Sequence, residues 1–165
     1  MAAMTITKEH YIAVAHRLLN HPGKCKNLHG HNYKIVYYLY AKKFSGGGVE
    51  ADSGMILDYY LVKEKVLKLI EAWFDHATIL QDTDPLADIL EQAGVAVQKI
   101  PTRPTAENMA GIIINLVNSK CLAEFDGDIQ CSRVEVWETP TSMAYCEQTQ
   151  IDEFTGRCGC GEHHE

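Results

Sequence analysis

One short stretch constrains the fold more than any other part of the chain. It runs from Gly23 to Tyr33 and carries Cys25, His29 and His31. Side chains two positions apart on an extended strand point to the same side, so His29 and His31 can bind one metal ion together. The stretch therefore predicts a strand whose histidines face a metal site.

His16 is the nearest upstream candidate for a third ligand, and its neighbours are typical of an earlier strand. Three neutral imidazoles leave one position of a tetrahedral zinc site open, which is typical of catalytic rather than structural zinc. Cys25 precedes His29 by a three-residue gap, and a thiolate beside a cation is stabilised as the anion. We therefore expect Zn²⁺ held by His16, His29 and His31, with Cys25 beside it as a base or nucleophile.

Composition places the chain among ordinary soluble domains. Of its 165 residues, 46% are hydrophobic and 22% are charged. This length is sufficient for the core of one domain, which we expect over residues 1–150. No apolar run approaches the roughly 20 residues of a membrane span, and the N-terminus lacks the pattern of a signal peptide. A net charge of -7 argues against general nucleic-acid binding. Six cysteines without a short disulfide framework indicate the reducing cytoplasm.

Apolar residues follow strand periods in some segments and helix periods in others. We expect strands at 6–17, 31–44, 55–57, 95–100, 127–138 and 142–147, and helices at 59–73, 85–92 and 105–121. Asp58 and Thr105 are suited to cap the two longer helices, because their side chains accept otherwise unpaired backbone N–H groups. The pattern predicts an α+β fold in which two helices pack on one face of an antiparallel sheet.

Five motifs occur in the order seen in a known family. They span roughly residues 8–148 and are His16 with Cys25-x-x-x-His29-Gly30-His31, Gly54–Asp58, Phe74–His76, Pro104–Asn108 and Val136–Thr139. Through them the chain resembles the 6-pyruvoyltetrahydropterin synthase superfamily. Within it, the short gap between Cys25 and His29 favours the 6-carboxytetrahydropterin synthases of 7-deazaguanine (queuosine) biosynthesis, since the 6-pyruvoyl enzymes usually have a longer gap.

The resemblance implies roles for further residues. Asp75 and His76 fall on the family's catalytic pair, which works with the cysteine, and a carboxylate can orient an imidazole as a positioned acid or base. Glu138 falls on the glutamate that anchors the pterin, whose amino group and ring N–H can bind one carboxylate bidentately. Thr105 falls in the threonine region near the pterin.

The resemblance also implies an architecture. This is the tunnelling fold (T-fold), a four-stranded antiparallel sheet with two helices on one face. The sheets of several subunits join into a barrel, usually in a homohexamer built as a dimer of trimers. Active sites then lie at subunit boundaries, which is one way for a small sheet to avoid open edges.

The expected activity is the zinc-dependent conversion of 7,8-dihydroneopterin triphosphate to 6-carboxy-5,6,7,8-tetrahydropterin, acetaldehyde and triphosphate. One alternative is a 6-pyruvoyltetrahydropterin synthase, which eliminates triphosphate without cleaving the carbon chain. Another is a non-catalytic module that binds a pterin or a metal. The tail at 151–165 lies outside the resemblance, and we expect it to be a mobile extension despite its terminal cysteines and histidines.

Overall fold

The computed structural model describes residues 2–44, 54–125 and 128–148. The glycines at 46–48 and the tail at 151–165 lie outside the described residues. The elements are β1 (Ala2–His16), η1 (Lys24–Lys26), β2 (His29–Phe44), α1 (Tyr59–Val62), η2 (Lys63–Leu67), α2 (Lys68–Phe74), β3 (Thr78–Gln81), α3 (Leu86–Gln92), β4 (Val97–Ile100), α4 (Ala106–Leu116), η3 (Val117–Cys121), η4 (Ala123–Phe125), β5 (Ile129–Thr139) and β6 (Ser142–Glu147).

The described strands form one six-stranded sheet in the order β4-β3-β1-β2-β5-β6. The expected four-stranded antiparallel sheet is therefore wrong in strand number and in part of its pairing. β1, β2, β5 and β6 pair antiparallel, but β3 runs parallel to the end of β1 and β4 runs parallel to β3. The strand expected at 95–100 is present as β4, whereas β3 was not expected, because its four residues are buried along most of its length and give no alternating pattern.

The expected strand at 55–57 is also wrong. The chain turns at Gly54, where φ is +81°, and leads directly into a helix. Leu57 joins the hydrophobic core, and the Asp58 side chain accepts the backbone N–H of Tyr60 at 2.8 Å. The expected cap at Asp58 is therefore confirmed, and the short apolar run before it packs under the helix instead of pairing with β2.

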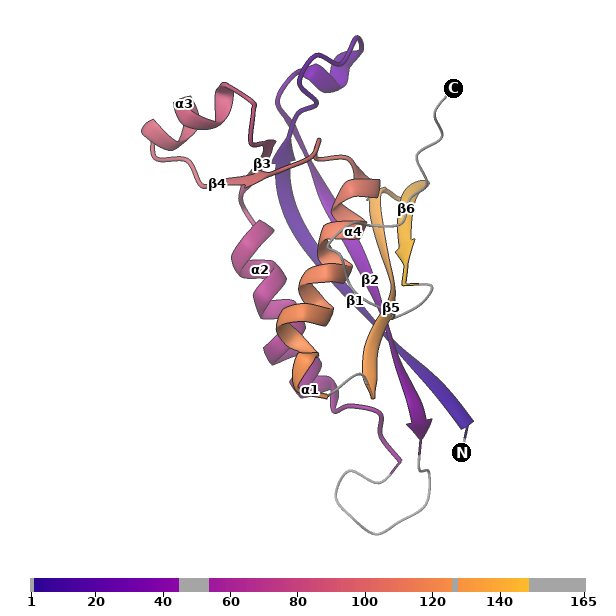
Figure 1. Cartoon of the computed structure of the whole chain (residues 1–165). Coiled ribbons are helices and arrows are strands. Elements are labelled where there is room, and N and C mark those ends of the chain that lie inside the picture. The colour runs from indigo at the N-terminus through magenta and orange to yellow at the C-terminus, as the bar shows by residue number, and fades with distance from the viewer. Residues whose placement is uncertain (1, 45–53, 126–127, 149–165) are drawn as a thin grey trace.

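The two long helical segments cover one face of the sheet, as Figure 1 shows. The first comprises α1, η2 and α2, and the second comprises α4 and η3. Their apolar stripes meet the inward side chains of β1, β2 and β5 in one core cluster, which includes Ile12, Val14, Tyr33, Ile35, Val66, Ile70, Met109, Ile113, Val134 and Val136. The expected α+β class with two helices on one face is confirmed, and this covered face is the one that carries the histidines.

None of the helices in the described residues is both long enough and apolar enough to cross a bilayer.

Candidate functional site

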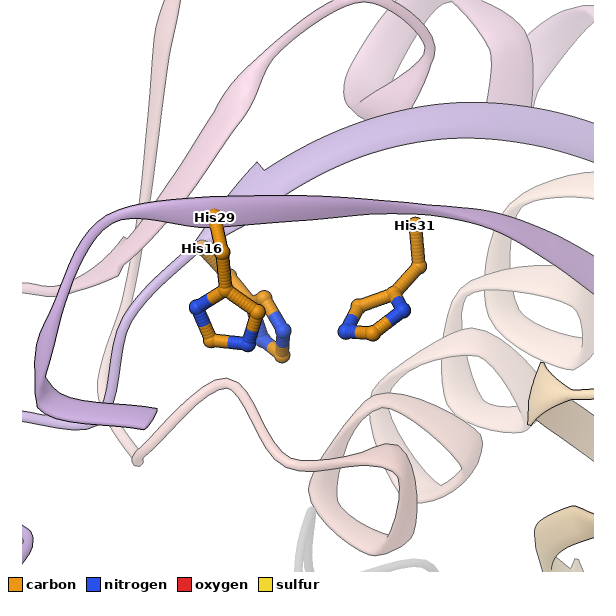
Figure 2. Close-up of side chains that lie close together, drawn as sticks. All are labelled: His16, His29 and His31. Atoms are coloured by element: carbon orange, nitrogen blue, oxygen red, sulfur yellow. The ribbon is translucent and has the colours of Figure 1, made fainter. Parts of the chain in front are cut away.

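The pairing of β1 with β2 brings the three histidines together. His16 lies opposite His29, and Val14 lies opposite His31, so the histidines occupy neighbouring inward positions at one end of the hairpin. One ligand nitrogen from each lies within 4.8 Å of the others. Figure 2 shows the three rings on the same side of the two strands. The expected grouping of His16, His29 and His31 is thus present in the structure.

Backbone carbonyls orient two of these imidazoles. Nδ1 of His16 donates to the carbonyl of Pro104 at 2.7 Å, and Nδ1 of His29 donates to the carbonyl of Asn27 at 2.8 Å. Each bond leaves Nε2 as the unprotonated nitrogen, which is the usual arrangement of metal-binding histidines, and the Tyr33 hydroxyl lies 3.3 Å from Nε2 of His16. Burial lowers the pKa of His16, against the opposing effect of the Pro104 carbonyl, so that ring is neutral at pH 7. This donor set fits zinc.

Glu138 on β5 and Tyr33 on β2 lie next to the histidine cluster. Oε1 of Glu138 lies 3.5 Å from Nε2 of His16 and 3.4 Å from Nε2 of His31. The hydroxyl of Tyr33, which is fully buried, donates to the same carboxylate oxygen at 3.3 Å. Sequence reasoning assigned no role to Tyr33, although its alternation with His29 and His31 on one strand places it on the same face.

A pocket of about 270 Å³ opens beside the cluster. Its lining brings together four of the residues singled out in the sequence, and in full it consists of His16, Leu18, Cys25, Thr105, Ala106, Glu107, Glu138, Ser142, Met143 and Ala144. Cys25 is a half-buried free thiol on η1, and its carbonyl accepts the backbone N–H of Leu18 at 2.8 Å. The pocket therefore places a thiol, a carboxylate and a histidine of the cluster around one space.

The start of α4 forms another wall of this pocket. Thr105 caps the helix, because its hydroxyl oxygen accepts the backbone N–H of Asn108 at 3.3 Å. The preceding Pro104 holds His16. Glu107, to which the sequence analysis assigned no role, also lines the pocket and was missed as a candidate.

Asp75 and His76 form a pair at the end of α2. Oδ2 of Asp75 lies 2.9 Å from Nδ1 of His76, and Oδ1 accepts the backbone N–H of Ala13 at 2.9 Å. The backbone N–H of His76 donates to the carbonyl of Ala13 at 2.7 Å, and this residue has a φ of +57°, which is uncommon outside glycine. The pair is thus fixed on β1, while the imidazole itself is 81% exposed.

His76 does not line the pocket that contains Cys25. It borders a separate open hollow, which is lined by Ala13, Val14, Ala15, Gly30, His31, Asn32, Ala77 and Thr78 in addition to His76. The side chains of Ala13, Ala15 and Asn32 alternate with those of Val14, His16 and His31, so most of this hollow lies on the sheet face opposite the side chains of the cluster, although His31 also borders it. Within one chain, the structure therefore brings His16, His29, His31, Cys25, Thr105 and Glu138 together, but leaves Asp75 and His76 on the other face.

The chain is similar to known proteins over most of its length. A family model described as 6-pyruvoyl tetrahydropterin synthase matches residues 5–149. A 6-carboxy-5,6,7,8-tetrahydropterin synthase of Haemophilus influenzae is 34% identical over 146 residues, which are 86% of this chain and 96% of that protein. A probable 6-carboxy-5,6,7,8-tetrahydropterin synthase of Halobacterium salinarum is 35% identical over 135 residues, which are 81% of this chain and 79% of that protein.

Solved structures share the fold. An uncharacterized protein of Wolinella succinogenes superimposes with a TM-score of 0.71 at 20% identity, over 90% of this chain and 99% of that one. A 6-pyruvoyl tetrahydropterin synthase of Caenorhabditis elegans superimposes with a TM-score of 0.62 at 23% identity, over 89% of this chain and 96% of that one. At these identities the likeness concerns the fold alone.

Proposed function

Since the chain belongs to the 6-pyruvoyl tetrahydropterin synthase family, we propose that it is a lyase of the 6-carboxy branch. Its substrate would be 7,8-dihydroneopterin triphosphate. With consumption of a water molecule, the products would be 6-carboxy-5,6,7,8-tetrahydropterin, acetaldehyde and triphosphate. The names of the relatives support the 6-carboxy product, and so does the short gap between Cys25 and His29.

The observation that carries this proposal is the shared pocket. His16, Cys25 and Glu138 line one space, and His29 and His31 stand next to His16. The space therefore offers a metal-binding face, a thiol and a carboxylate to a single bound molecule. A module that only bound a metal would have no need for the thiol or for a pocket of this size beside the ligands.

The three imidazoles would hold Zn²⁺, which supplies Lewis acidity that lowers the pKa of hydroxyl groups on the substrate side chain. Cys25, as a thiolate, would remove a proton from that side chain. A half-buried position suits this role, because the residue lines the pocket while its backbone carbonyl is held by the N–H of Leu18.

Glu138 would anchor the pterin ring. A carboxylate can accept the amino N–H and the ring N–H of a pterin together, in two parallel charge-assisted hydrogen bonds. Tyr33 supports this geometry, since its buried hydroxyl donates to Oε1 and limits rotation of the carboxylate. Thr105 would contact the same ring from the start of α4, on the opposite wall of the pocket.

Asp75 and His76 would act in the site of a neighbouring subunit. In their own chain they lie on the face opposite Cys25, yet the imidazole is exposed and oriented by the carboxylate. We therefore propose a homo-oligomeric barrel, a hexamer of two trimers, in which each site combines Cys25 of one chain with His76 of the next. The free thiols at Cys25, Cys121 and Cys131 suit a reducing cytoplasm.

The test is mass spectrometry of the products formed when the zinc-loaded protein meets 7,8-dihydroneopterin triphosphate. A carboxypterin together with acetaldehyde is the expected result. A pyruvoyl product would assign the chain to the 6-pyruvoyl branch instead. Absence of turnover in protein shown to contain zinc would contradict an enzymatic role and favour a binding module. The chelated protein and the zinc-loaded Cys25→Ala variant serve as negative controls.

A further inference from the structure

An ion pair lies directly beside the histidine cluster. Arg17 follows His16 in the chain, and its guanidinium binds Asp84 through two N–H groups. Nε donates to Oδ2 at 2.8 Å, and Nη2 donates to Oδ1. The side chain of Asp84 is 0% exposed and that of Arg17 is 22% exposed. Paired N–H groups on one carboxylate fix the relative orientation of both partners, in contrast to a single-point contact.

Asp84 is itself firmly held. Oδ1 also accepts the backbone N–H of Leu86 at 2.9 Å, and the backbone N–H of Asp84 donates to the carbonyl of Gln81 at 2.9 Å. Its carbonyl accepts the backbone N–H of Ala87 at 3.0 Å. Asp84 is therefore anchored between the end of β3 and the first turn of α3, elements that Figure 1 shows at the end of the sheet near the loop from β1 to β2.

Arg17 lies in the chain between His16 and Leu18, two residues that line the pocket. On one side is His16, whose Nδ1 is held by the carbonyl of Pro104. On the other is Leu18, whose backbone N–H donates to the carbonyl of Cys25 at 2.8 Å. This last bond joins the two arms of the loop between β1 and β2, so the position of the thiol depends on where residues 17 and 18 leave the sheet.

We propose that Arg17 and Asp84 are positioning residues: their ion pair fixes the exit of the chain from β1 and thereby holds Cys25 at its working distance from the histidine cluster. The inference rests on the proposed function for the role of the thiol. The pterin anchor Glu138 and the cap Thr105 are carried by other elements. Weakening the ion pair should therefore disturb the thiol while leaving pterin binding largely intact.

The experiment compares Arg17→Lys and Asp84→Asn with Asp88→Asn in zinc-loaded protein. Arg17→Lys keeps the positive charge without the paired N–H groups, and Asp84→Asn keeps the shape without the charge. Asp88→Asn is the matched control, because Asp88 is an exposed residue of α3, the helix that follows Asp84, and its Oδ1 pairs with Nζ of Lys99 at 2.8 Å. The measurements are kcat, KM, zinc content, thermal unfolding, and the pH profile of Cys25 alkylation by iodoacetamide with peptide mapping.

We expect Arg17→Lys and Asp84→Asn to lower kcat by about 100-fold, the size of loss that a misplacement of about 1 Å produces. KM should change by less than about threefold, because binding of the pterin is retained. Zinc should stay bound, and the pH profile of Cys25 alkylation should move. Asp88→Asn should match the unaltered protein in every measurement.

Two results would overturn the inference. One is an unaltered kcat and alkylation profile in both variants. The other is a loss of activity that only follows the loss of folded protein, since that would make the ion pair structural. Arg17→Lys keeps the charge on a partly exposed side chain, so it remains informative if Asp84→Asn folds poorly. Should the unaltered protein fail to turn over the pterin substrate, the proposed function falls, while the alkylation profiles still test the positioning of Cys25.

Discussion

The carboxylate of Glu138 faces the imidazole of His16, with 3.5 Å between Oε1 and Nε2. The same oxygen lies 3.4 Å from Nε2 of His31. The group proposed to anchor the pterin is therefore also a negative charge close to two of the proposed zinc ligands. Substitution of Glu138 should therefore affect both pterin binding and zinc binding, by different amounts.

Glu138→Gln should weaken pterin binding by about 30- to 100-fold, because an amide cannot accept from both pterin donors and a charge-assisted bond is lost. Zinc affinity should fall by a smaller factor, since only a nearby charge is removed. Fluorescence titration with an unreactive pterin and competition for zinc with a chelating dye measure the two effects. Glu124→Gln, on the exposed η4, is the control. Unchanged pterin affinity in Glu138→Gln would contradict the proposed anchor.

Cys25→Ala should lower turnover by at least about 100-fold, the usual contribution of a general base, while the zinc content stays unchanged. Cys121→Ser is the matched control. The Cys121 thiol is buried against the carbonyl of Lys65, and a serine hydroxyl can make the same bond. An active Cys25→Ala variant would remove the thiol from the mechanism.

Alkylation at pH 8 should modify Cys25 well before the core cysteines. Burial raises the pKa of Cys121 to about 11 and that of Cys131 to about 12, so both remain protonated thiols under these conditions. Peptide mapping after a short exposure to iodoacetamide measures the order of reaction. Early modification of Cys131 would show that the core around it opens more readily than its complete burial indicates.

His29→Ala should weaken zinc binding by at least about 100-fold, because it removes one of the three ligands. The loss of a ligand should cost more affinity than the loss of a residue that only orients a ligand. His21→Ala is the control. His21 lies in the same loop, and its Nδ1 accepts the backbone N–H of Gly23 rather than facing the cluster. Zinc titration followed by elemental analysis distinguishes the variants, and equal zinc content in both would contradict the assigned ligand set.

Cys25→Ala and His76→Ala should complement each other when the two inactive variants are unfolded, mixed and refolded. In a random symmetric oligomer, about a quarter of the shared sites would regain both native groups. Activity assays of the mixture against each variant alone measure the effect. A mixture as inactive as its components would contradict a site shared between subunits.

The fold was predictable where long segments carry a clear period. The helix expected at 59–73 and the helix that begins at α4 follow from apolar spacing and from the caps at Asp58 and Thr105. The strands β1, β2, β5 and β6 follow from apolar spacing. The strand expected at 95–100 is present as β4, but β3 was not predicted, because four residues are too few to show a period. The parallel pairing of β3 with β1 and of β4 with β3 was not predicted either, because it is decided by the path of the chain after α2.

The site was predictable to the extent that its residues lie close in the sequence. His29 and His31 share a strand face, and His16 reaches them because β1 and β2 form a hairpin. Glu107 and the orienting carbonyl of Pro104 were not predicted, because their role depends on where the start of α4 docks against β1. That docking is a tertiary contact with no local signal.

The register of the β1–β2 hairpin has a consequence for how such a chain tolerates insertions and deletions. A single residue added inside β1 between Ile12 and His16 would turn that ligand to the opposite face, away from His29 and His31, unless a bulge absorbed it. A residue added between Leu19 and Pro22 would leave the paired strands in place. Insertions and deletions in this protein should therefore accumulate at the tip of the loop between β1 and β2 and be absent from the ends of β1 and β2 that carry the histidines.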